Sequence, residues 1–145
     1  MTEVQFHFNV PDLQSYTCRL LRKAFGARAQ VFVMAPGDVL DALDRALWSF
    51  SALDFIPHCL AGASERVRAR SPIVLGVDCR QSATHNVLLN LGSALPQGFE
   101  RFERLIELVG PNAQERQQAR LRWRHYTERG YNIIRHDVAA PPAGA

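Results

Sequence analysis

The sequence predicts a single α/β domain built around a mostly parallel sheet. Strand-like and helix-like patterns alternate through the first fifty residues, which is typical of a right-handed β–α–β unit. The run at residues 30–35 is almost continuously apolar, as expected for a strand that is covered on both faces. A length of 145 residues is typical of one domain, and burial of roughly two thirds of the unfolded surface gives such a chain a self-sufficient core.

The first half of the chain predicts two strands and two helices in alternation. Residues 4–10 alternate apolar and polar side chains, which indicates a strand with one buried face. Asp12 can cap a helix whose apolar residues recur at helical spacing, and Gly26 fits the end of that helix. After the apolar strand, Pro36 begins a second helix. We expect the inner face of this second helix to consist of Val39, Leu40, Leu43, Ala46 and Leu47.

The middle of the chain gives weaker patterns. Residues 62–71 are mostly basic and polar, and we expect an exposed loop there. Residues 73–77 and 87–91 are short apolar runs that are typical of strands. The segment at residues 99–109 fits a helix or a strand, because its apolar spacing is compatible with both.

A long final helix is predicted near the end of the chain. Asn112, with Glu115 three residues later, matches the start of a capping box, and Gly130 fits the position just after the last turn. We expect residues 1–138 to form one domain. Residues 139–145 are rich in Pro and Ala, and we expect them to form a flexible tail.

The cysteines and the N-terminus predict a cytoplasmic protein without a membrane span. Cys18, Cys59 and Cys79 are odd in number and widely spaced, which is typical of reduced thiols in a reducing compartment. The first residues form no basic and apolar leader of the kind that directs secretion. No stretch approaches the roughly 18 consecutive apolar residues of a membrane-spanning helix.

The sequence contains no recognisable cofactor, metal or catalytic motif. A dinucleotide-binding unit needs a glycine-rich turn after its first strand, whereas residues 9–12 contain no glycine and end in an acid. The histidines show no metal-ligand spacing, and the adjacent His58 and Cys59 are poorly placed to bind one ion. No serine lies in a nucleophile-elbow motif. We therefore expect no cofactor, no metal site and no catalytic residue.

An aromatic-rich segment at residues 43–62 is the first candidate site. It places several large apolar residues across a helix end and the connection that follows, and these residues are Trp48, Phe50, Phe55, Ile56 and Pro57. So many large groups cannot all point inward from so short a stretch. The segment therefore predicts either a second patch of core or a hydrophobic docking surface, since aromatic residues are enriched at interfaces.

One face of the predicted final helix is the second candidate site. Lys23 is the single lysine among the 17 basic residues, and arginine binds carboxylates and phosphates with a planar fork. The residues that recur at intervals of three and four on this face are Arg116, Arg120, Trp123, Arg124 and Thr127. Arginines beside an aromatic ring predict a site for an acidic peptide or a nucleic-acid strand, or else a solvated basic face.

Both candidate segments resemble a known protein family. LDRALWSFSALDFIPHCLAG (residues 43–62) and ARLRWRHYTERGYN (residues 119–132) are similar to the chi subunit of bacterial DNA polymerase III holoenzyme, an accessory protein of the clamp-loader complex. The resemblance implies a Rossmann-like three-layer domain without a nucleotide-binding glycine loop. It also implies a non-catalytic adaptor in DNA replication. Such an adaptor links the psi subunit to the acidic, Phe-ending C-terminal tail of single-stranded DNA-binding protein, and so contacts nucleic acid only indirectly.

The resemblance also assigns residues to the two partners. The residues implied for binding the tail are Val109, Arg116, Arg120, Trp123, Arg124 and Gly130. We expect Arg120 to bind the terminal carboxylate, because a charged carboxylate favours the forked donors of arginine. The residues implied for the psi-facing surface are Trp48, Phe55 and Pro57.

Two residues depart from the family pattern. Thr127 occupies a position where a basic residue appears in one relative from the family, and Arg129 could replace that charge. Trp123 stands in place of a tyrosine, which keeps an aromatic ring but lacks the hydroxyl. An alternative function is direct binding of single-stranded nucleic acid by the final helix and the basic stretch at residues 66–70, although a net charge of only +3 argues against strong binding of this kind. A small Rossmann-like enzyme with an unfamiliar site is a third alternative.

Overall fold

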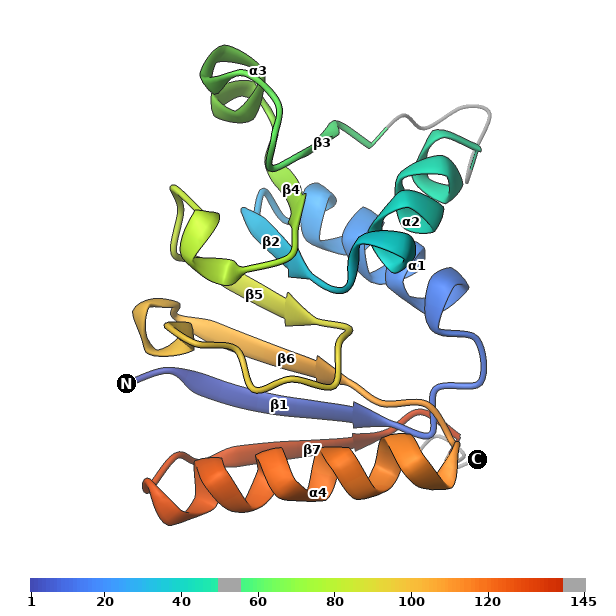
Figure 1. Cartoon of the computed structure of the whole chain (residues 1–145), viewed down its shortest axis with the longest axis vertical. Helices are drawn as coiled ribbons and strands as arrows, with labels where there is room; N and C mark the ends of the chain where they lie inside the picture. The colour runs from blue at the N-terminus through green and yellow to red at the C-terminus, as the bar shows by residue number, and fades with distance from the viewer. Residues whose placement is uncertain (50–55, 140–145) are drawn as a thin grey trace.

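The computed structural model of the chain describes residues 1–49 and 56–139. Its strands are β1 (Glu3–Phe8), β2 (Val31–Met34), β3 (His58–Leu60), β4 (Ile73–Gly76), β5 (Val87–Asn90), β6 (Arg104–Leu108) and β7 (Ile133–Asp137). They form one sheet in the order β3-β4-β2-β5-β6-β1-β7 (Figure 1). Every neighbouring pair is parallel. The predicted α/β fold is therefore confirmed, and its sheet is parallel throughout.

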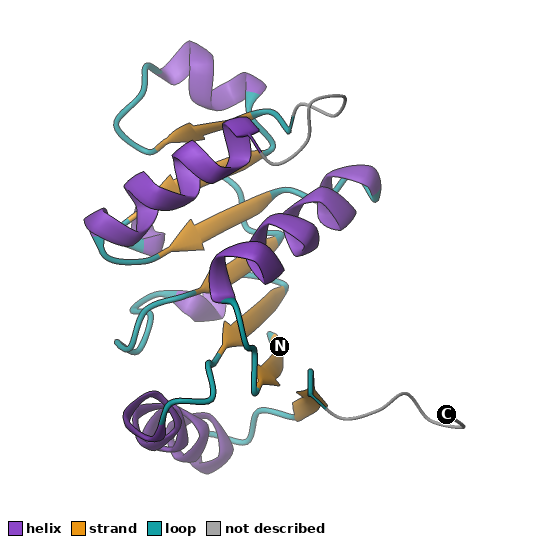
Figure 2. Cartoon of the chain, turned by 90° about the vertical axis from the view of Figure 1, so that its right-hand side faces the viewer, coloured by secondary structure: helices purple, strands orange, loops and turns teal. Residues whose placement is uncertain are grey.

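Helices cover both faces of this sheet. They are α1 (Leu13–Gly26), α2 (Gly37–Ser49), α3 (Glu65–Arg70) and α4 (Ala113–Glu128), with the short 3-10 turns η1 (Cys79–Gln81) and η2 (Phe99–Arg101). α1 and α2 lie on one face of the sheet (Figure 2). α4 lies on the opposite face, beside β1 and β7 at the other end of the molecule. The three layers confirm the Rossmann-like architecture that the resemblance implies.

The sheet has an apolar layer on each face, because side chains alternate along each strand. Val31 and Val33 of β2 pack with Leu43 of α2 on one face. Phe32 of β2 points the other way and belongs to the layer that contains Tyr126 of α4. All four residues of β2 are buried, which explains why its sequence is apolar at every position.

Two predictions in the first half of the chain are wrong in part. Residues 62–71 do not form a loop throughout, because residues 65–70 are the helix α3. Ser64 caps α3, with its Oγ accepting a hydrogen bond from the Val67 amide at 3.3 Å. Val39 is 39% exposed and does not lie on the inner face of α2. The buried residues of α2 are Leu40, Leu43 and Leu47.

The two edge strands, β3 and β7, were not predicted from the sequence. β3 is only three residues long and falls within the aromatic-rich segment. Most of β7 is exposed, since it pairs on one side only and carries no apolar run. The ambiguous segment at residues 99–109 divides into η2 and β6, so the strand alternative is confirmed for its second half.

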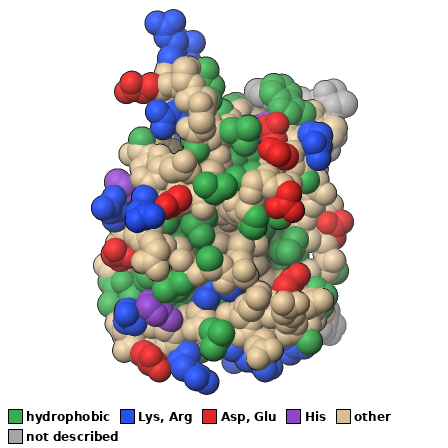
Figure 3. All heavy atoms as spheres, viewed as in Figure 1, with side chains coloured by type: hydrophobic (Ala, Val, Ile, Leu, Met, Phe, Trp, Pro, Cys, Tyr) green, Lys and Arg blue, Asp and Glu red, His purple; other side chains and the backbone are tan. Residues whose placement is uncertain are grey.

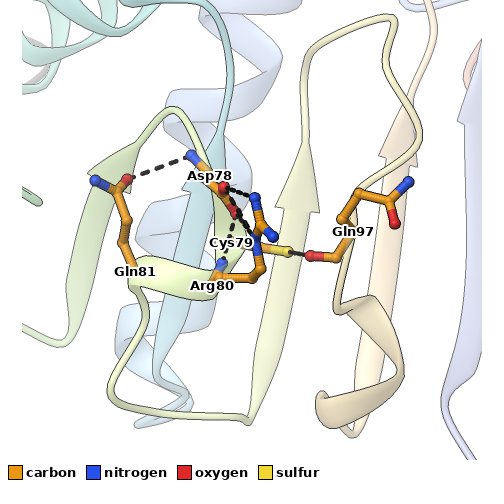
Figure 4. A network of polar contacts seen from close by, with 5 residues as sticks. All are labelled: Asp78, Cys79, Arg80, Gln81 and Gln97. Atoms are coloured by element: carbon orange, nitrogen blue, oxygen red, sulfur yellow. Dashed lines mark hydrogen bonds and ion pairs between the residues drawn. The ribbon is translucent and has the colours of Figure 1, made fainter.

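The connection after β4 is held by polar contacts around a buried thiol. The Cys79 thiol donates to the carbonyl oxygen of Gln97 at 3.0 Å, and the Asp78 carboxylate pairs with Arg80 at 2.7 Å (Figure 4). Burial raises the pKa of the Cys79 thiol to about 11, and the nearby Asp78 carboxylate adds to the rise. The thiol is therefore protonated at neutral pH, which makes it a poor nucleophile.

Cys18, Cys59 and Cys79 are all buried and free. Within residues 1–49 and 56–139, no group of three or more His, Cys, Asp or Glu side chains is arranged to hold a metal ion. The same part of the chain contains no helix with the length and apolar character needed to cross a membrane.

Candidate functional site

The candidate site is built on α4, whose ends are fixed by local interactions. The Asn112 Oδ1 atom accepts hydrogen bonds from the amides of Gln114 (2.8 Å) and Glu115 (3.3 Å). The Glu115 carboxylate accepts a hydrogen bond from the Gly110 amide at 2.9 Å, so it ties the preceding turn to the helix. Gly130 follows α4 with a φ of +82°, a conformation that glycine adopts without a steric penalty.

A buried polar cluster fixes the inner face of α4 on the sheet. Glu107 of β6 is fully buried, and its Oε2 atom accepts hydrogen bonds from Arg122 Nε (3.1 Å) and the Tyr126 hydroxyl (2.6 Å). Asn90 of β5 donates to Glu107 Oε1 at 2.8 Å. Arg122 also donates to the Ser93 carbonyl oxygen at 2.8 Å. These bonds set the rotation of α4 on the sheet and therefore decide which of its side chains remain accessible.

The charges in this cluster follow from burial and from its donors. Burial raises the pKa of the Glu107 carboxyl, and the Arg122 charge and the donated hydrogen bonds oppose that rise. Burial and the neighbouring Glu107 raise the pKa of the Tyr126 hydroxyl far above its ordinary value. The Tyr126 hydroxyl therefore stays protonated, and it donates a hydrogen bond to Glu107. No local pattern in the sequence indicated this cluster.

A pocket of about 370 Å³ lies between α4 and the strands β1 and β7. Its lining residues are Phe6, Phe8, Val109, Arg116, Ala119, Arg120, Trp123 and Arg135. Three of these residues are arginines and the others are apolar. In Figure 3, basic side chains (blue) are visible at the lower end of the molecule, where Figure 1 places α4. An apolar pocket edged by forked cations suits a ligand that combines an aromatic or aliphatic group with negative charge.

Four of the six residues implied for tail binding line this pocket: Val109, Arg116, Arg120 and Trp123. Arg124 is exposed on α4 but is not part of the lining. Gly130 follows the end of α4 and is also outside the lining. The Thr127 hydroxyl donates to the Trp123 carbonyl oxygen at 2.9 Å and adds no charge at its position. The binding role of all six residues stays a prediction.

The other four lining residues were not identified from the sequence. Phe6 and Phe8 come from β1, and the Phe6 ring lies 5.1 Å from the Trp123 ring, measured between centroids. Arg135 comes from β7, which was not predicted from the sequence. The alternation in β1 was a usable signal for Phe6 and Phe8, but it does not show which helix covers them.

The aromatic-rich segment contributes both buried and exposed residues. Trp48, at the end of α2, is 62% exposed, whereas Ile56 is buried. The Trp48 ring lies 5.4 Å from the His58 ring in an edge-to-face arrangement, and Pro57, directly before His58 in the chain, is partly exposed. Phe50 and Phe55 lie outside the described residues. The segment thus forms core at Ile56 and presents an aromatic surface at Trp48.

A second crevice, of about 520 Å³, lies at the carboxyl ends of β2, β5 and β6. Parallel α/β sheets commonly bind nucleotides at this edge. Here the charged lining residues are Asp38, Glu115 and Arg122, and the Arg122 charge already pairs with Glu107. The two remaining acids disfavour a phosphate, in agreement with the missing glycine-rich turn.

The fold and the pocket define a Rossmann-like α/β domain that carries an arginine-edged apolar pocket on its last helix and no glycine-rich phosphate turn. The family model described as "DNA polymerase III chi subunit, HolC" matches residues 1–134. The chain therefore belongs to the chi subunit family of DNA polymerase III, as the resemblance predicted.

Individual relatives agree with this assignment. The chain is 33% identical to the DNA polymerase III subunit chi of Pseudomonas aeruginosa over 142 residues, which cover 94% of this chain and 96% of that protein. It is 30% identical to the subunit of the same name from Escherichia coli over 92 residues, or 63% of this chain and 61% of that protein. The Haemophilus influenzae subunit is 27% identical over 97 residues, with 66% of each chain covered.

Proposed function

We propose that this protein is a non-catalytic replication adaptor that binds the acidic, Phe-ending C-terminal tail of single-stranded DNA-binding protein. The observation that carries the proposal is the pocket on α4, where an apolar floor meets three arginines. The terminal Phe side chain would contact the floor at Phe6 and Val109. Arg120 would bind the terminal carboxylate, and Arg116 would contact acidic side chains that precede it.

The availability of these arginines supports the proposal. The Arg116 and Arg120 side chains are exposed and make no hydrogen bond or ion pair within the part of the chain that the structure describes. Their donors are therefore free to bind carboxylates, which guanidinium groups can engage with two parallel hydrogen bonds. Because the tail is short and flexible, ordering it costs free energy, and we expect micromolar affinity. Salt should weaken the complex, since the charges are partly exposed.

Removal of the terminal Phe from the tail is expected to abolish measurable binding, because the pocket floor then loses its apolar ligand. The measurement is isothermal titration of the protein with a peptide that copies the last ten or so residues of its own organism's single-stranded DNA-binding protein. A second titration uses the same peptide without the Phe. The proposal predicts one-to-one binding of the first peptide alone, and it is wrong if neither peptide binds.

A parallel measurement separates the adaptor from the alternative of direct nucleic-acid binding. Fluorescence anisotropy with labelled single-stranded DNA at physiological salt should show weak or no binding when no partner protein is present. Tight binding under these conditions would favour the nucleic-acid-binding alternative instead, with the arginines of α4 as its contacts.

We further propose that the surface around Trp48 binds the psi subunit. A large exposed aromatic side chain is typical of an interface anchor, and the Trp48 ring lies at the end of α2, edge-to-face with the His58 ring. Phe55 is part of this proposal, although it lies outside the described residues.

Substitution of Trp48 by serine is expected to weaken psi binding at least tenfold, because it removes the anchor. Binding can be measured by titration with the purified psi subunit. Leu121→Ser is a matched control, since Leu121 is 63% exposed but lies on α4, at the other end of the molecule from the surface around Trp48. Equal affinities for Trp48→Ser and the unchanged protein would contradict the proposal.

A further inference from the structure

Arg135 occupies the strand side of the pocket on α4, opposite the arginines of the helix. It lies on β7 in register with Phe6 of β1, and register partners in parallel strands point to the same face of the sheet. Phe6 faces α4, so Arg135 extends over the same face. Ile134 and His136, its neighbours in β7, point to the opposite face, where the His136 ring lies 5.1 Å from the His7 ring.

Two aromatic rings hold the Arg135 guanidinium in place. Its central carbon lies 5.6 Å from the centroid of the Phe8 ring and 5.5 Å from the centroid of the Trp123 ring. Both distances lie within the range of cation–π attraction. A planar guanidinium can stack on rings while its N–H groups remain directed outward. The rings therefore restrict the side chain before any ligand binds.

The donors of Arg135 have no acceptor within residues 1–49 and 56–139, because the side chain makes no hydrogen bond or ion pair there. This distinguishes it from Arg122 on the inner face of α4, whose charge is neutralised by Glu107. A held cation with free donors, next to an apolar floor, is suited to bind a carboxylate with little additional loss of side-chain entropy.

We infer that Arg135 is a specificity-determining residue of the pocket, and that it binds an acidic side chain of the peptide at a position before the terminal residue. This inference rests on the proposed function. It also supplies the positive charge that Thr127 lacks, from β7 and not from Arg129. Arg129 instead contacts His125 on α4, with its Nη1 atom 3.3 Å from His125 Nδ1, and it does not line the pocket.

The test compares Arg135→Gln with Arg129→Gln, which removes the same charge from a nearby exposed position. Titration with the tail peptide should show a loss of affinity of about tenfold for Arg135→Gln and less than twofold for Arg129→Gln. Arg135→Lys keeps the charge but loses the stacked plane, and we expect an intermediate loss. Arg135 is exposed on an edge strand, so each variant should fold, and circular dichroism checks this.

Two further readouts separate direct contact from a packing effect. Affinity of Arg135→Gln should depend less steeply on salt than that of the unchanged protein, because one charge contact is gone. When the internal acids of the peptide are replaced by amides, the affinities of Arg135→Gln and of the unchanged protein for that peptide should differ by less than twofold. When only the terminal carboxylate of the peptide is amidated, the affinity difference between Arg135→Gln and the unchanged protein should remain about tenfold.

The outcomes for the inference and for the proposed function are distinct. If the unchanged protein binds the peptide and Arg135→Gln binds equally well, the role of Arg135 is wrong and the proposed function stands. If Arg135→Gln lowers the affinity equally for the acidic peptide and for the peptide whose internal acids are replaced by amides, Arg135 acts through packing of Trp123 and the inference is overturned. If the unchanged protein does not bind the peptide, the proposed function fails, and the role of Arg135 fails with it.

Discussion

Substitution of Glu107 by alanine is expected to lower the free energy of unfolding by about 3–5 kcal/mol. The loss follows from the charge left behind, because Arg122 is buried beside Glu107 and would have no carboxylate to neutralise it. The Tyr126 hydroxyl and the Asn90 amide would each lose an acceptor as well. Urea unfolding followed by circular dichroism measures the change as a lower transition midpoint.

A double variant shows whether the unpaired charge is the cause. Glu107→Leu combined with Arg122→Met removes both charges and keeps most of the volume, and such replacements of buried ion pairs are often neutral or stabilising. We expect this variant to be more stable than Glu107→Ala, although Tyr126 and Asn90 still lack one acceptor. Equal destabilisation of the two variants, or a Glu107→Ala protein as stable as the original, would show that the cluster does not hold α4 by its charge.

This cluster links the stability of the fold to the geometry of the candidate pocket. Arg122 and Tyr126 bind to the sheet from the inner face of α4, and Arg116 and Arg120 are thereby presented at the pocket. Arg122 belongs to the same arginine-rich stretch of the sequence as Arg120. Arg122 pairs with the buried Glu107, whereas Arg120 lines the pocket. The difference depends on helix rotation, which sequence spacing alone does not fix.

The elements predicted correctly are those with strong local signals. β2, predicted from the apolar run at residues 30–35, is buried on both faces and apolar at all four of its positions, and the start of α4 is marked by the capping side chain of Asn112. The edge strand β7 lacks such a signal, because most of its residues are exposed and it contains Arg135 and His136 among its five residues. Its existence depends on pairing with β1, which is a long-range interaction that no local pattern encodes.

The same reason explains which part of the candidate pocket was missed. Arg116, Arg120 and Trp123 lie on one helix, so their periodicity in the sequence places them together. Phe6 and Arg135 reach the pocket only because β1 and β7 are neighbours in the sheet. The sequence could therefore predict the helical side of the pocket, whereas the strand side required the topology.

Substitution of Arg120 by alanine is expected to weaken binding of the tail peptide tenfold or more, on the order of 1.5–3 kcal/mol for hydrogen bonds to a charged group. Arg120 lines the pocket from α4 and makes no ion pair with any described residue that would compete for its donors. The substitution removes an exposed side chain from a helix in which alanine is favourable. The fold should therefore persist, and isothermal titration compares the variant with the unchanged protein.

Arg129→Ala is the matched control for this measurement, because Arg129 is an exposed arginine directly after the end of α4 that does not line the pocket. We expect it to weaken binding only through long-range charge, so its effect should be small and should disappear at high salt. The effect of Arg120→Ala should persist in part at high salt, since direct hydrogen bonds are lost. Unchanged affinity for Arg120→Ala would remove Arg120 from the site. A larger loss of affinity for Arg129→Ala than for Arg120→Ala would instead place the carboxylate contact at the end of α4.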